Sequence, residues 1–186
     1  NYWCRQLLQW QKKHRGEFCQ RWVLKTPAHL GYLDILLATF PDAHIVHLHR
    51  DPVDTIPSGA SLNTTLWRMH ADDVDPKQVG QQWLERMSWT NRRALAARKA
   101  LEGNDQRFTD IHFHDAVRDP ISQAEKIYMA LCQPLPDSTR TAMTDWLLED
   151  SQQKLPKHHY RAEDFGLTDA LIERKFQAYK QRFHAN

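Results

Sequence analysis

The chain has 186 residues, of which 41% are hydrophobic and 26% charged, a composition typical of globular proteins that excludes wholesale disorder. No apolar run reaches the roughly 20 residues that a membrane-spanning helix needs, so no membrane association is expected. Basic residues outnumber acidic ones by 6 to 1 in residues 1–30 and by 7 to 4 in residues 151–186, whereas acidic residues prevail by 18 to 12 between them. This distribution predicts a local basic site where the two ends meet, and not a nucleic-acid-binding surface.

The chain contains no internal repeat and no Gly- or Ser-rich linker, so we expect a single domain over residues 1–186. Its three cysteines, Cys4, Cys19 and Cys132, have neither a paired nor a zinc-binding spacing. They predict free, mostly buried thiols in a reducing compartment, which favours a cytoplasmic location.

The first half of the chain predicts alternating helices and strands. Apolar residues recur at helical spacing over residues 3–14 and 29–40, and the short apolar runs 21–24 and 44–49 predict strands. The second strand is followed at once by Arg50-Asp51-Pro52, in which Asp51 can cap a helix and Pro52 can occupy its first position.

The second half continues the alternation. Helices are expected from Pro76 to about residue 101, over residues 121–131, around Trp146 and over residues 168–183, with a third strand at residues 109–114. The basic run 92–99 predicts a solvated helix face. Strands that alternate with helices predict right-handed crossovers and a mostly parallel sheet, which binds ligands beyond the carboxyl ends of its strands.

The turn at residues 49–52 is the first candidate site. A strand delivers Arg50 to the carboxyl edge of the sheet, and a helix begins two residues later. Its free amides, the positive end of its dipole and the guanidinium converge on one point, which favours a phosphate. The alternative is an ion pair of Arg50 with Asp51 or Asp54 beside an ordinary capped helix.

The segment Lys25-Thr26-Pro27-Ala28-His29 is the second candidate site, because it follows a predicted strand at the same edge. Its lysine, hydroxyl and imidazole are groups that stabilise developing charge and accept a proton. The alternative is that Lys25 is solvated and His29 merely begins a helix.

Three segments in this order, residues 22–30, 40–43 and 49–58, resemble the middle of sulfotransferases that use 3′-phosphoadenosine-5′-phosphosulfate (PAPS). The similarity is strongest to the mainly bacterial branch that carries Lys-Ser/Thr-Pro-x-His. Residues 157–167 are similar to the C-terminal signature of that branch, and residues 111–120 to its third sheet strand and the following turn. The resemblance implies an α/β fold, with a P-loop-NTPase-like parallel sheet flanked by helices.

The resemblance also implies roles for individual residues. Arg50 and Ser58 match the Arg and Ser, eight residues apart, that hold the 3′-phosphate. Lys25 and Thr26 match a pair near the transferred sulfuryl group. Another branch has its catalytic histidine directly after Lys-Thr, where this chain has proline, so His29 is a candidate base by proximity alone.

The late loop of the family closes over the nucleotide, and Lys157, His158 and Tyr160 match it. The family begins with a strand and a Gly- or Ser-rich phosphosulfate loop, which this sequence lacks. We therefore expect an N-terminally truncated domain that lacks its first central strand and has the missing N-terminal segment as a partner.

The function implied is transfer of a sulfuryl group from PAPS to a hydroxyl or amine of a small-molecule or glycan acceptor, without a metal ion. Three alternatives compete with this function. The chain could be a non-catalytic nucleotide- or partner-binding relative. His47, His49, His112 and His114 could surround a zinc ion if their strands were neighbours. A kinase-like phosphotransferase lacks support, because the sequence has no Walker loop.

Overall fold

The computed structural model describes residues 6, 9, 23–101, 105–150 and 160–184. Most of the helix expected over residues 3–14 lies outside these residues. The elements follow the chain in this order: η1 (Pro27–Tyr32), α2 (Leu33–Thr39), β1 (Ile45–His49), α3 (Pro52–Arg68), α4 (Pro76–Lys99), η2 (Asp105–Arg107), β2 (Phe108–His112), α5 (Phe113–Arg118), α6 (Pro120–Ala130), α7 (Asp137–Asp150), η3 (Ala162–Phe165) and α8 (Asp169–Phe183).

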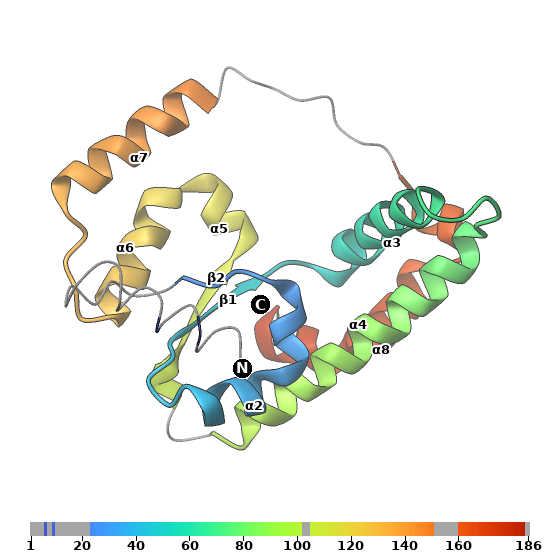
Figure 1. Ribbon diagram of the computed structural model, residues 1–186, viewed down its shortest axis with the longest axis horizontal. Helices are drawn as coiled ribbons and strands as arrows, with labels where there is room; N and C mark the ends of the chain where they lie inside the picture. The colour runs from blue at the N-terminus through green and yellow to red at the C-terminus, as the bar shows by residue number, and fades with distance from the viewer. Residues whose placement is uncertain (1–5, 7–8, 10–22, 102–104, 151–159, 185–186) are drawn as a thin grey trace.

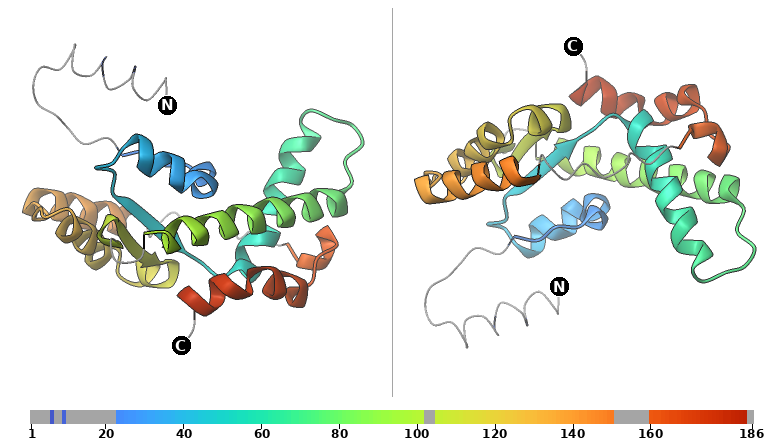
Figure 2. Two further views of the ribbon diagram at one scale, coloured as in Figure 1. Left: turned by 90° about the horizontal axis from the view of Figure 1, so that it is seen from below. Right: turned by 90° about the horizontal axis from the view of Figure 1, so that it is seen from above.

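Strands β1 and β2 form a parallel pair, with a register that runs from Ile45 opposite Phe108 to His49 opposite His112. Helices α5, α6 and α7 lie to one side of this pair and α3, α4 and α8 to the other (Figure 1). Figure 2 shows α2 and α8 on opposite sides of the long helix α4. The prediction of an α/β fold with a parallel sheet flanked by helices is therefore confirmed.

Three helices begin at Asp-Pro pairs, as the sequence predicts. The carboxylates of Asp51, Asp75 and Asp119 accept hydrogen bonds from backbone amides of the first turns of α3, α4 and α6, at 2.9, 2.9 and 3.0 Å. Each cap satisfies an amide that has no partner inside its helix, and proline fits the first helical position because it has no amide to satisfy.

The main core lies between α3, α4, η3 and α8. Its buried members are Ile56, Ala60, Leu84, Ala162, Phe165, Leu167, Ile172, Phe176 and Tyr179. Packing is tight where α3 crosses α4, because a methyl group on Gly59 would come within 2.2 Å of the Trp83 indole nitrogen. The C-terminal helix is thus held against the elements that carry the first candidate site.

Three local predictions are wrong. Val23 and Leu24 are not in a strand, and Val23 is 90% exposed, so the run gains no burial that would hold it extended. The predicted third strand ends at His112 and not at residue 114. Residues 113 and 114 instead form the first turn of α5. Cys132 is free and exposed, not buried, while Cys4 and Cys19 lie outside the described residues.

The faces of β1 are the reverse of the usual arrangement. His47 and His49 are buried, whereas the apolar Val46 and Leu48 are 45% and 54% exposed. Side chains alternate between the two faces of a strand, so one buried face holds both imidazoles.

No helix among the described residues is long and apolar enough to cross a membrane.

Candidate functional site

The site begins at the carboxyl ends of the two parallel strands. β1 ends at His49 and β2 at His112, which are register partners, so the residues that follow them emerge at one edge of the sheet. These residues are Arg50 and Phe113, and the Arg50 guanidinium carbon lies 4.4 Å from the centre of the Phe113 ring. The aromatic face attracts the cation and holds it at the sheet edge.

Arg50 has hydrogen-bonding capacity that the described part of the chain does not use. Its Nε is buried without a hydrogen-bond partner there, and the nearest carboxylate oxygen, on Asp54, is 3.9 Å away. An orphaned guanidinium N–H beside the amino-terminal end of α3 is a suitable donor for an oxyanion. The alternative ion pair with Asp54 is therefore present but loose.

The pairing of Arg50 with Asp51 does not occur among the described residues. The Asp51 carboxylate instead caps α3 through the amide of Val53 and lies 3.4 Å from Lys180 Nζ of α8. Burial is the largest single influence on the pKa of Lys180 and lowers it, but the contacts with Glu173 and Asp51 together outweigh burial and raise the pKa overall. Lys180 of the basic C-terminal region thus reaches the candidate site, whereas the predicted meeting of the two basic ends stays a prediction, because most of residues 1–30 lie outside the described residues.

Ser58 is half-buried in the second turn of α3. It stands four residues after Asp54, which itself stands four after Arg50, so the three follow one another along one side of the turn and helix. Ser58 makes no hydrogen bond or ion pair with Arg50 in the described part of the chain. The assignment of the pair to a 3′-phosphate stays a prediction.

Residues 25–29 surround the start of η1. Lys25 and Thr26 are exposed, and the Thr26 hydroxyl accepts a hydrogen bond from the Ala28 amide at 3.3 Å, which caps η1. His29 is half-buried within η1, an element that packs on α4. Among the described residues, neither Lys25 nor His29 is bonded to Arg50, so their catalytic roles stay predictions.

Tyr160 is half-buried and packs against the core between α3 and α8. Its predicted contact with the nucleotide is untested. Lys157 and His158, assigned to the same loop, lie outside the described residues.

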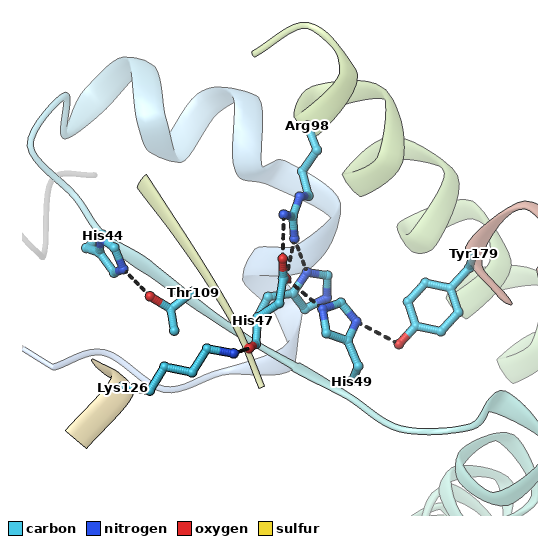
Figure 3. Close-up of polar contacts among 8 residues, drawn as sticks. His44, His47, His49, Arg98, Thr109, Lys126 and Tyr179 are labelled. Carbon is cyan, nitrogen blue, oxygen red and sulfur yellow. Dashed lines mark hydrogen bonds and ion pairs between the residues drawn. The ribbon is translucent and has the colours of Figure 1, made fainter. Parts of the chain in front are cut away.

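A buried polar network behind Arg50 was missed by the sequence analysis. The carboxylate of Asp110, on β2, accepts bonds of 2.6 and 2.8 Å from Arg98 and of 2.7 Å from His49 Nε2 (Figure 3). His49 Nδ1 lies 3.0 Å from the Tyr179 hydroxyl of α8. The network therefore joins α4, both strands and α8 directly beneath the candidate site.

Burial and hydrogen bonding set the protonation states in this network. Burial, reinforced by nearby His49 and Arg98, lowers the pKa of His47 to about 3, so this imidazole is neutral. Burial alone would raise the pKa of Asp110, but the bonds from His49 and Arg98 hold it well below its usual range. Burial raises the pKa of Tyr179 to about 12, so its hydroxyl keeps its proton.

The same network bears on the zinc alternative. His114 lies in α5 and not on the strand face of His112, so the expected ring of four histidines does not form. Within the described ranges, the group with metal-ligand spacing is His47, His49 and Asp110. Asp110 already has a cationic partner in Arg98, whose guanidinium also lies 3.3 Å from His47 Nδ1.

One signal in the sequence pointed to this network. Asp110 is a carboxylate within a predicted buried strand, where it needs a partner. The prediction of a solvated face for residues 92–99 is wrong for Arg98, whose side chain is 2% exposed. It approaches the rings of Phe108 and Phe183 to 4.3 and 5.0 Å, contacts that no helical periodicity reveals.

The chain is similar in sequence to curated sulfotransferases. The chain is 29% identical over 119 residues to the omega-hydroxy-beta-dihydromenaquinone-9 sulfotransferase Stf3 of Mycobacterium bovis and Mycobacterium tuberculosis, matching 59% of the chain and 28% of the relative. The chain thus spans about a quarter of the length of these curated relatives.

The structure is similar to two crystal structures of mycobacterial sulfotransferases. The TM-score is 0.76 to STF9 of Mycobacterium avium, at 29% identity over 89% of this chain and 42% of that one. The TM-score to STF1 of Mycobacterium tuberculosis is 0.69, at 31% identity over 86% of this chain and 40% of that chain. The family model described as the sulfotransferase family matches residues 1–137. This chain belongs to the sulfotransferase family.

Proposed function

We propose that this chain serves in the transfer of a sulfuryl group from PAPS, and that it supplies the 3′-phosphate site and part of the catalytic site. The observation that carries the proposal is Arg50, which stands at the carboxyl edge of the sheet beside the capped start of α3, with a buried Nε that has no hydrogen-bond partner among the described residues. A dianionic phosphate at this point would accept the unused donor and face the positive end of the helix dipole. Ser58, four residues beyond Asp54 in α3, would add a hydroxyl.

In the proposed reaction the acceptor oxygen forms a bond to the sulfur of PAPS as the bond from sulfur to the phosphate oxygen breaks. That oxygen leaves with the electron pair as part of adenosine 3′,5′-bisphosphate, and the acceptor loses its proton to a base. Lys25 stabilises the negative charge on the transferred group, Thr26 contacts the donor, and His29 accepts the proton. The exposure of Lys25 and Thr26 supports this, because both can reach a ligand.

We propose a small-molecule hydroxyl as the acceptor. Support comes from the curated relatives, whose name gives an omega-hydroxylated dihydromenaquinone as their substrate. No step of the proposed reaction requires a metal ion, since Arg50 and Lys25 supply the positive charge. The proposed setting is the cytoplasm, in keeping with a free Cys132.

The test is calorimetric titration of the protein with adenosine 3′,5′-bisphosphate and, separately, with adenosine 5′-monophosphate. The two ligands differ only in the 3′-phosphate. A charge-assisted hydrogen bond contributes about 1.5–3 kcal/mol, so the bisphosphate should bind at least about tenfold more tightly. Equal affinities would contradict the proposal and favour a site that binds the nucleotide in some other way.

A further inference from the structure

The β1–α3 turn, His49-Arg50-Asp51, is held by two adjacent residues of α8. The Tyr179 hydroxyl lies 3.0 Å from His49 Nδ1. Lys180 Nζ lies 3.4 Å from the Asp51 carboxylate. The residues on both sides of Arg50 are therefore bonded to a helix about 130 residues further along the chain.

The bonds through Tyr179 form a continuous chain. A carboxylate only accepts, so His49 Nε2 carries a proton and donates it to Asp110. The other ring nitrogen, Nδ1, is bonded to the Tyr179 hydroxyl, which is both a donor and an acceptor and so suits either form of the ring. Asp110, His49 and Tyr179 thus join β2, the β1–α3 turn and α8.

The Arg50 side chain depends on this backbone support because its own contacts are loose. Among the described residues its guanidinium is held by the Phe113 ring at 4.4 Å and by Asp54 at 3.9 Å, and its Nε makes no hydrogen bond. The direction in which the side chain leaves the turn is therefore set by the backbone at residues 49–51. The stacking of His49 on Phe183, with ring centres 4.0 Å apart, ties the same turn to α8 a third time.

We propose that Tyr179 and Lys180 are positioning residues, which fix the β1–α3 turn and thereby aim the Arg50 guanidinium at the anionic ligand. The assignment of that ligand as a 3′-phosphate rests on the function proposed above. The positioning itself does not, because it depends only on contacts within the protein. Neither residue touches the reacting atoms in this account.

The experiment compares Tyr179→Phe with Tyr128→Phe, which removes a hydroxyl from a half-buried tyrosine of α6. The first readout is amide hydrogen exchange of residues 49–51 without nucleotide, expected to be about 3- to 10-fold faster in Tyr179→Phe and unchanged in Tyr128→Phe. The second is affinity for adenosine 3′,5′-bisphosphate, expected to fall by about 3- to 10-fold, with adenosine 5′-monophosphate affected less than twofold.

Unchanged exchange at residues 49–51 in Tyr179→Phe overturns the positioning role, whatever the nucleotide results. If exchange rises in Tyr179→Phe but neither the original protein nor the variant distinguishes the two nucleotides, the positioning role stands and the proposed 3′-phosphate function fails. Should Tyr179→Phe not fold, Lys180→Gln replaces it, because this side chain is 28% exposed whereas Tyr179 is 5% exposed in the core. It should raise exchange at Asp51 by about 2- to 5-fold, and no change there is equally decisive against the proposal.

Discussion

Arg98 and Asp110 form a bidentate ion pair, with bonds of 2.6 and 2.8 Å, in which the guanidinium is 2% exposed. The pair links the last turn of α4 to the middle of β2, and His49 bonds the same carboxylate. A buried charge is tolerated only with such a partner, so the position of α4 against the sheet depends on this contact.

Asp110→Ala should therefore be strongly destabilising, because it leaves the Arg98 charge buried without its carboxylate. Removing one partner of a buried ion pair costs about 3–5 kcal/mol in the free energy of unfolding. The control is Asp115→Ala, whose partner Arg118 is 74% exposed and which should change stability by less than about 0.5 kcal/mol. Urea denaturation measures both, and equal effects would show that burial of Arg98 is not what makes Asp110 important.

His47 makes the stability of the protein depend on pH. Its pKa of about 3 in the folded state is lower than in the unfolded chain, near 6.5, so between these values the unfolded state binds a proton that the folded state does not. Stability is therefore fully present above about pH 6.5 and falls as the pH decreases toward 3. Between pH 6.5 and 5 the loss from this one group is up to about 2 kcal/mol.

His47→Gln should reduce this acid sensitivity, measured as the change in the free energy of unfolding between pH 7 and 5. His70→Gln is the control, because His70 is exposed. If both variants lose as much stability on acidification as the original protein does, His47 is not the group responsible.

Gly59→Ala should destabilise the protein even though alanine favours a helix. Its methyl group would come 2.2–2.8 Å from atoms of the Trp83 indole, so the indole or one of the two helices must shift. Overpacking of this kind costs about 1–3 kcal/mol, more than the roughly 1 kcal/mol gained in helix propensity. Combining the change with Trp83→Phe should cost less than the sum of the two single changes, and simple additivity would argue against the clash.

In a longer protein that also contains the family's first strand and phosphosulfate loop, His29→Ala should lower kcat for sulfuryl transfer by about 10²–10⁴, with the affinity for the nucleotide nearly intact, if His29 is the base. Single-turnover transfer of labelled sulfate from PAPS separates the two quantities. His70→Ala removes an exposed imidazole elsewhere and serves as the matched control. More than half of the original turnover in His29→Ala would exclude His29 and leave Lys25 as the residue of the segment with a catalytic role.

The sequence predicts much of the fold because its signals are local. The Asp-Pro helix starts at Asp51, Asp75 and Asp119 each depend on a few adjacent residues, and all three are confirmed. The parallel pairing of β1 and β2 follows from the alternation of strands and helices. The exposed run at Val23 fails because a strand also needs a neighbour, which local sequence does not reveal.

The candidate site is only partly predictable for the same reason. Arg50 is marked by the strand, turn and helix around it, whereas the bond between His49 and Tyr179 joins residues 130 positions apart. Arg98 looks solvated from its basic neighbours and becomes buried only when α4 packs on β2. Such long-range contacts follow from tertiary packing, and a single sequence carries no pattern for them.

The most direct test of the central claim is the coupling between Arg50 and the 3′-phosphate. Calorimetry gives the affinities of the original protein and of Arg50→Ala for adenosine 3′,5′-bisphosphate and adenosine 5′-monophosphate, with Arg118→Ala as a control on an exposed arginine. We predict that Arg50→Ala lowers the affinity for the bisphosphate about 10- to 150-fold and the affinity for the monophosphate less than twofold. Arg118→Ala should change neither affinity. Equal losses for the two nucleotides in Arg50→Ala would contradict the assignment of the β1–α3 turn as a 3′-phosphate site.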